Sequence, residues 1–80
     1  RLGSAYLYQL INEFNGSYIM ALAGYNAGPH RVKRWIRLYG DPRKNKNEID
    51  WIEQIPFNET RNYVKRVIEN LNVYRELVKE

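Results

Sequence analysis

A stretch of small residues bounded by glycine and proline restricts how this chain can fold more than any other feature. Residues 21–29 read Ala-Leu-Ala-Gly-Tyr-Asn-Ala-Gly-Pro. Glycine permits backbone angles that other residues avoid, and proline suits the first turn of a helix, where its missing N–H costs nothing. We therefore predict a helix that ends near Gly24 to Asn26, a tight corner, and a second helix that begins at Pro29. The corner holds Tyr25 and Asn26 in fixed positions, where they can bind a sugar or another polar ligand. The plainer interpretation is a half-buried tyrosine and an asparagine that caps a helix.

Apolar residues recur at the helical period in five segments, and no segment alternates as a half-buried strand does. Ser17 is a good N-cap for the second helix and Asn58 for the last. Residues 41–47 contain nothing apolar to bury, so we predict a surface loop, and the short helix after it should bury Ile49 and either Trp51 or Ile52. The class is all-α, with about five helices and no sheet. The predicted helices cover residues 2–14, 18 to between 24 and 26, 29 to about 39, 48–54, and 59 to almost 80.

The composition bounds the function only loosely. Eighty residues form one domain at most. Because the chain has no cysteine and one histidine, we expect neither a disulfide nor a metal site. We also expect no cofactor. No apolar run approaches the length of a membrane span. The net charge of +4 favours polyanionic surroundings without choosing among nucleic acid, membrane and cell wall. Because the chain starts at Arg1 inside an amphipathic pattern, with no capping residue before it, we expect the C-terminal part of a larger domain.

Three motifs stand in a fixed order along the chain. They are Leu-Gly-Ser-Ala-Tyr-Leu at residues 2–7, Ala-Gly-Tyr-Asn-Ala-Gly-Pro at residues 23–29, and Ile-Pro-Phe-Asn-Glu-Thr-Arg-Asn-Tyr-Val at residues 55–64. In this order and at this spacing they resemble the C-terminal half of the soluble lytic transglycosylase catalytic domain, which has a lysozyme-like fold. The resemblance covers nearly the whole chain and implies that residues 1–80 form a single partial domain.

The resemblance implies an enzyme that cleaves peptidoglycan between N-acetylmuramic acid and N-acetylglucosamine without adding water. In that family one glutamic acid protonates the glycosidic oxygen and then takes the proton of the sugar's own 6-hydroxyl, which closes a 1,6-anhydro ring. The family's glutamate lies in a Glu-Ser motif that a Gly-Leu-Met-Gln motif follows, and neither motif occurs here. We therefore predict no catalytic residue within this chain and expect the general acid and base upstream.

The resemblance also assigns four residues to the substrate-binding cleft. Tyr25 and Asn26 match the family's Tyr-Asn motif, and Glu59 and Tyr63 match its Glu-Thr-Arg-x-Tyr motif. A plain structural role stays open for the last two residues. A glutamate in the first turn of a helix is favoured by the helix dipole without any substrate, and a tyrosine on an apolar stripe can belong to the core.

The expected partners are a peptidoglycan glycan strand and either the missing N-terminal half of the domain or a second copy of the chain. The second expectation rests on apolar residues that would lose their cover, namely Leu2, Tyr6, Leu10 and the stripe from Val64 to Leu77. The resemblance implies the periplasm or cell envelope of a bacterium, with neither a nucleic-acid partner nor a transmembrane segment. Two alternatives stay open: a glycan-binding module that does not cut and, more distantly, a basic helical domain that binds DNA.

Overall fold

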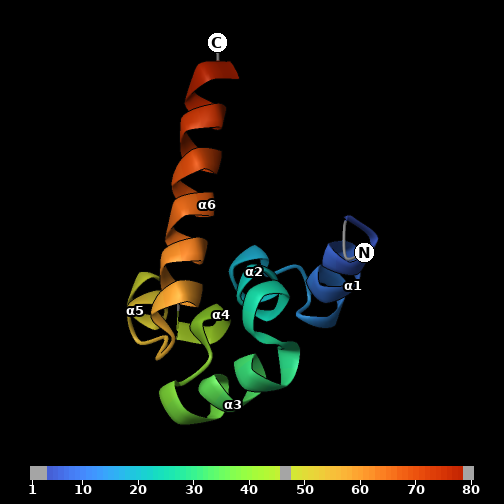
Figure 1. Cartoon of the computed structure of the whole chain (residues 1–80), viewed down its shortest axis with the longest axis vertical. Helices are drawn as coiled ribbons and strands as arrows, with labels where there is room; N and C mark the ends of the chain where they lie inside the picture. The colour runs from blue at the N-terminus through green and yellow to red at the C-terminus, as the bar shows by residue number, and fades with distance from the viewer. Residues whose placement is uncertain (1–3, 46–47, 79–80) are drawn as a thin grey trace.

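The chain forms helices and turns throughout the part that its computed structural model describes, which is residues 4–45 and 48–78, with backbone alone for residues 4, 45 and 72–78. No strand occurs in these ranges, so the all-α prediction is confirmed. In Figure 1, α2 lies between α1 and α6, and α6 extends beyond the other helices at its C-terminal end. The helices are α1 (Ser4–Glu13), α2 (Tyr18–Ala27), α3 (Pro29–Tyr39), α4 (Pro42–Asn45), α5 (Glu48–Glu53) and α6 (Asn58–Val78).

A single residue, Gly28, ends α2 and begins α3. Its N–H donates to the carbonyl of Gly24 at 2.8 Å, and its own carbonyl accepts from the N–H groups of Arg31 and Val32 at 3.2 and 3.4 Å. Its φ of 101° and ψ of 138° lie where side chains other than glycine are strained. The predicted corner is therefore confirmed. However, α2 continues to Ala27, so the tyrosine and asparagine before the corner lie in the last turn of a helix.

The helix ends follow the predicted caps except at α6. The hydroxyl of Ser17 accepts from the N–H of Met20 at 3.2 Å and caps α2, as predicted. Asn58, the predicted cap of α6, is instead the first residue of that helix, and its carboxamide oxygen accepts from the Arg61 guanidinium. The backbone N–H of Arg61 donates to the carbonyl of Phe57 at 2.9 Å, so the helix begins one residue earlier than the predicted cap allows.

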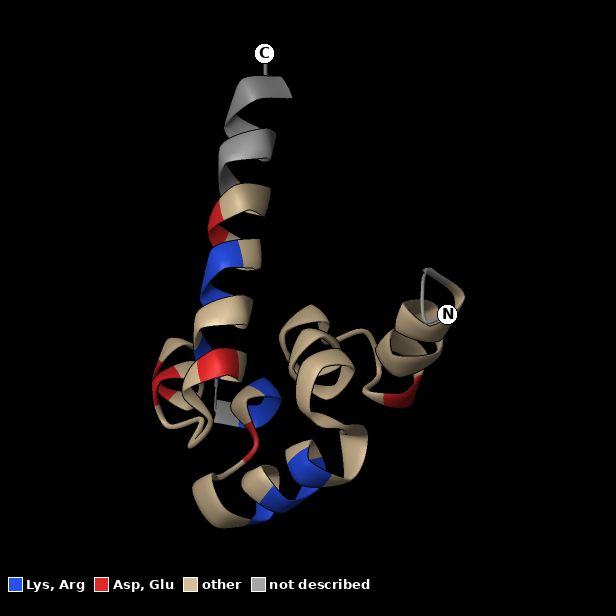
Figure 2. Cartoon of the chain, viewed as in Figure 1, with Lys and Arg blue, Asp and Glu red and all other residues tan. Residues whose placement is uncertain are grey.

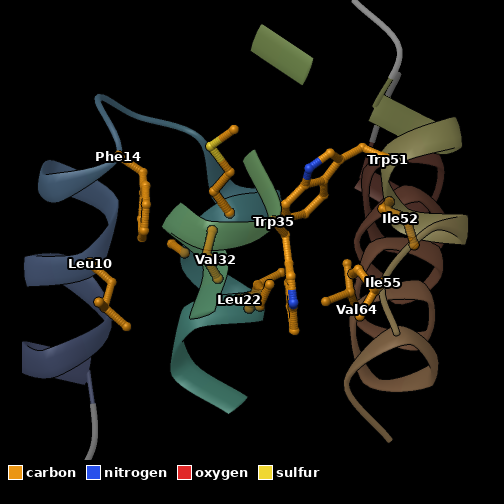
Figure 3. Close-up of a cluster of buried hydrophobic side chains, with 12 residues drawn as sticks. Leu10, Phe14, Leu22, Val32, Trp35, Trp51, Ile52, Ile55 and Val64 are labelled. Atoms are coloured by element: carbon orange, nitrogen blue, oxygen red, sulfur yellow. The ribbon is translucent and has the colours of Figure 1, made fainter. Parts of the chain in front are cut away.

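The core forms around α2, where the run from Met20 to Gly24 is buried on every side. Leu10 of α1 and Phe14, in the turn after α1, pack against one side of this cluster, and Val64 of α6 belongs to its other side (Figure 3). The side chains of Leu10 and Val64 are 1% and 0% exposed. The expectation that these two would be left open is therefore wrong, because α1 and α6 both bury an apolar face against α2. Leu2 lies outside the described residues, as do the side chains beyond Leu71.

The segment predicted to be a loop contains a short helix, α4, and is tied to the rest of the fold. Pro42 is buried. The Arg43 guanidinium donates to the carbonyl of Phe14 at 3.0 Å and to both carboxylate oxygens of Asp41 at 3.0 and 2.8 Å. In α5 both Trp51 and Ile52 are buried, whereas Ile49, expected to be buried, is 75% exposed. Trp51 and Ile52 occupy the side of the six-residue helix α5 that faces the core. Ile49 lies on another side of α5 and is therefore exposed.

Within the described ranges no helix is long and apolar enough to cross a membrane. No group of three or more histidine, cysteine, aspartate or glutamate side chains in these ranges is placed to hold a metal ion.

Candidate functional site

A buried threonine fixes the side chain of Asn26 where α2 meets α6. The hydroxyl of Thr60 donates to the Asn26 Oδ1 atom at 2.6 Å, and the Thr60 side chain is 1% exposed. Because the carboxamide oxygen is engaged, the amide nitrogen of Asn26 keeps its two N–H groups for other acceptors. Asn26 itself is exposed to solvent. The arrangement therefore presents hydrogen-bond donors to a ligand from a side chain whose orientation is fixed.

Three half-buried tyrosines from three helices lie near one another, and one of them, Tyr25, precedes this asparagine in α2. The rings of Tyr6 in α1 and Tyr25 in α2 lie 5.9 Å apart between centroids, with 43° between their planes. Burial, and secondarily the neighbouring Tyr25, raise the pKa of the Tyr63 phenol above its usual value. Tyr63 therefore stays a neutral hydroxyl donor at physiological pH. The cluster offers ring surface and phenol groups, which suit the mixed apolar and hydroxylated faces of a sugar.

Glu59 lies at the exposed edge of this cluster. It is exposed, stands in the first turn of α6 and precedes Tyr63 by four residues, so the two share one face of the helix. The structure thus brings Tyr25, Asn26 and Tyr63 together and places Glu59 one turn away.

Two members of the cluster, Tyr6 and Thr60, were not predicted. The sequence placed Tyr6 on the apolar face of the first helix, although it stands within the first of the three motifs. Thr60 stands next to Glu59 in the third motif, and it is four residues before the buried Val64. A hydroxyl group on the buried face of a helix requires a hydrogen-bond partner. This requirement could have indicated that Thr60 contacts a polar side chain.

Comparisons with known proteins place the chain in a family. The family model for the transglycosylase SLT domain matches residues 1–49, and the model for the soluble lytic transglycosylase helical domain matches residues 54–80. The chain therefore belongs to the transglycosylase SLT domain family. One core joins the two matched segments, since Val32 and Trp35 from the first cluster with Ile55 and Val64 from the second.

Among individual proteins, the soluble lytic murein transglycosylase of Salmonella typhimurium (strain LT2) is 38% identical over 77 residues, which are 96% of this chain. The protein of the same name from Escherichia coli (strain K12) is 38% identical over 74 residues, or 92% of the chain. The chain spans only 12% and 11% of the lengths of these two relatives. No solved structure matches the chain.

Proposed function

We propose that this chain forms part of the glycan-binding cleft of a peptidoglycan lytic transglycosylase. The observation that carries the proposal is the cluster of Tyr25, Asn26 and Tyr63, in which Thr60 fixes the Asn26 side chain. All three residues stand in motifs that resemble those of the family. The whole protein would cleave the β-1,4 bond between N-acetylmuramic acid and N-acetylglucosamine and leave a 1,6-anhydro end. A glutamate outside these 80 residues would supply the general acid and base, and residues 1–80 would form one part of a single domain.

Each residue then has a role in holding the sugar. The free N–H groups of Asn26 donate to a sugar hydroxyl or to an acetamido carbonyl. The phenol of Tyr63 stays protonated and donates beside it. Tyr25 offers its ring as an apolar surface and its phenol hydroxyl as a hydrogen-bonding group that helps to orient the sugar. Glu59 accepts from a hydroxyl at the edge of the cleft. Because the attacking group is the sugar's own 6-hydroxyl, holding the ring in the reactive conformation contributes directly to the rate.

We propose a glycan strand of peptidoglycan as the ligand, and the periplasm or cell envelope of a bacterium as the location, because the relatives named above are murein transglycosylases of bacteria. We also propose that the rest of the domain, or a second copy of the chain, covers an apolar cavity between α1, α2 and α6. This cavity has a volume of about 260 Å³, and it is lined by Leu7, Ile11, Tyr18, Leu22, Val67 and Leu71.

The test replaces the two motif residues of α2 in the intact protein. Tyr25→Phe and Asn26→Ala should each lower the release of 1,6-anhydromuropeptides from purified peptidoglycan by about tenfold or more, since each removes groups that orient the sugar. Mass spectrometry measures the products, and thermal unfolding should change little. Tyr8→Phe is the matched control, because Tyr8 is 67% exposed on α1.

Three results bear on the proposal. Full activity in both variants, or loss of activity only through unfolding, would make the pair structural and contradict it. An intact protein that binds peptidoglycan and releases no anhydro product would instead be a glycan-binding module. The 80 residues alone should release no product, and a product from them would place the general acid inside this chain, with Glu59 the first candidate.

A further inference from the structure

Helix α3 carries a basic surface that the proposed glycan cleft does not use. It holds Arg31, Lys33, Arg34 and Arg37 and no acidic residue (Figure 2). Lys33 pairs with Glu13 of α1 at 2.7 Å. The ion pairs among the described residues include neither Arg31 nor Arg34. These two arginines stand three residues apart and so share one face of the helix, where like charges disfavour each other in the absence of an anion.

This face of α3 forms one wall of a groove of about 460 Å³. Pro56 and Phe57, which precede α6, line the opposite wall. The volume is typical of sites for small ligands. The α3 side is lined by His30, Arg31, Arg34, Trp35, Leu38 and Tyr39, none of which belongs to the proposed cleft.

Aromatic contacts hold one of the arginines in place. The guanidinium carbon of Arg31 lies 4.7 Å from the centroid of the Phe57 ring, a distance at which a cation is attracted to a ring face. Phe57 in turn meets the buried Trp35 edge-on, with 5.5 Å between centroids and 78° between planes. A stacked guanidinium keeps its N–H edges available, and these edges match a carboxylate in two-point geometry. Arg31 is therefore positioned in advance for an anion.

Apart from the exposed His30, the remaining surface of the groove is apolar and open. Leu38 is 62% exposed, Tyr39 is 39% exposed and Phe57 is 38% exposed. A ligand that fits must therefore combine negative charge with an aliphatic group a few ångströms away. We propose that the groove binds a short acidic peptide, with its carboxylates on Arg31 and Arg34 and an aliphatic side chain over Leu38 and Pro56.

A peptide fits the groove better than a nucleic acid does. Nucleic-acid grooves present a long track of cations for successive phosphates and open aromatic faces for the bases. Here two arginines and one histidine converge in one short groove, and the Phe57 ring already carries the Arg31 guanidinium. The aliphatic surface of Leu38 gives a base little to stack on.

Isothermal titration calorimetry on the intact protein tests the proposal, with acetyl-Leu-Glu-Leu-Glu-amide as the probe. Arg34→Ala should weaken its binding by about tenfold or more, because it removes a charge-assisted hydrogen bond. Arg37→Ala is the matched control, since it removes the same charge from α3 without touching the groove. Leu38→Ala should also weaken binding, and the glutamine version of the peptide should not bind.

Absence of binding by the acidic peptide would overturn the proposal. Equal weakening by Arg34→Ala and Arg37→Ala would do the same, because it would show general attraction to a basic helix. Tighter binding of a single-stranded oligonucleotide of the same charge, lost in Arg34→Ala, would replace the peptide by a phosphate ligand. The arginine and leucine side chains involved are exposed, so unchanged thermal unfolding should accompany every variant. The outcome is independent of whether the protein cleaves glycan.

Discussion

Thr60 is buried, yet its hydroxyl serves a side chain that faces solvent. Thr60→Val keeps the shape and removes the donor to Asn26, so the carboxamide can turn. We expect a loss of about 1 kcal/mol in the free energy of unfolding, typical of one hydrogen bond. We also expect a fall in the release of anhydromuropeptides by the intact protein beyond what unfolding explains. Chemical denaturation and product analysis measure the two effects.

Thr60→Ser distinguishes the contribution of the Thr60 hydroxyl from that of its methyl group. It keeps the donor to Asn26 and should retain most of the activity, although it removes a buried methyl group at a cost of about 1 kcal/mol. If Thr60→Val and Thr60→Ser lost activity equally, packing of Thr60 and not orientation of Asn26 would be the cause.

Asp41 makes the stability of the fold depend on pH in the acid range. The side-chain hydrogen bonds from Arg43 lower the pKa of Asp41 below its ordinary value of 3.8. A carboxyl group whose pKa is lower in the folded state stabilises the fold above its unfolded pKa, and this contribution disappears as the pH falls through the folded pKa. Asp41→Asn should therefore destabilise the protein at about pH 7, and the difference from wild type should shrink at about pH 2. Urea unfolding at the two pH values measures this.

Asp50→Asn is the matched control for this change, because Asp50 is an exposed carboxyl group on α5. Its difference from wild type should be smaller at about pH 7. A difference for Asp41→Asn that stayed constant down to about pH 2 would show that the contact of Arg43 with Phe14, and not the charge of Asp41, supplies the stability.

The junction of α2 and α3 depends on the backbone of Gly28. Gly28→Ala forces a side chain onto a φ of 101°, and we expect a loss of about 1–3 kcal/mol in the free energy of unfolding. Gly24→Ala is the matched control, because the added methyl group meets the Phe14 ring at 3.4 Å, an ordinary van der Waals distance. Thermal or urea unfolding compares them. Equal losses in the two variants would mean that the backbone angle of Gly28 is not the cause.

Helices could be predicted from the sequence wherever one residue dictates the backbone. Pro29 and Gly40 bound α3, and Ser17 begins α2, through properties of those residues alone. The short helix α4 could not be predicted, because the Arg43 contact that ties it down reaches the Phe14 carbonyl, 29 positions away.

The candidate site could likewise be predicted only in part. Tyr25 and Asn26 stand in a recognisable motif, whereas the hydrogen bond from Thr60 joins residues 34 positions apart. No spacing rule connects positions so far apart along a chain. The position of Thr60 on the buried face of α6 could have indicated that its hydroxyl needs a hydrogen-bond partner. Only the packing of α6 on α2 shows that this partner is Asn26.

The whole molecule leaves an apolar cavity between helices that do not close on each other. Leu7 and Ile11 of α1 face Val67 and Leu71 of α6 across it. Burying apolar surface is worth about 25 cal/mol per Å², so an apolar cover over this cavity favours an associated state. We therefore expect the 80 residues at micromolar concentration to associate, with the rest of the domain when it is supplied or with a second copy. Sedimentation velocity measures this.

Leu71→Gln should weaken the association because it makes the cavity polar. Ile49→Gln is the matched control, since Ile49 is 75% exposed and does not line the cavity. A compact monomer that unfolds cooperatively would contradict the expectation and show that the core around α2 suffices.

The shared cap at Gly28 also limits how the chain can vary in length. A helix turns by about 100° for each residue, so one inserted or deleted residue between Asn26 and Gly28 would rotate Tyr25 and Asn26 by that angle relative to α3. Only Gly28 stands between the two helices to absorb the change. If α3 kept its place in the core, the Asn26 carboxamide would therefore leave the Thr60 hydroxyl. Natural relatives with this site should therefore keep the distance from the tyrosine to the proline constant, and place their insertions outside the segment that joins these two residues.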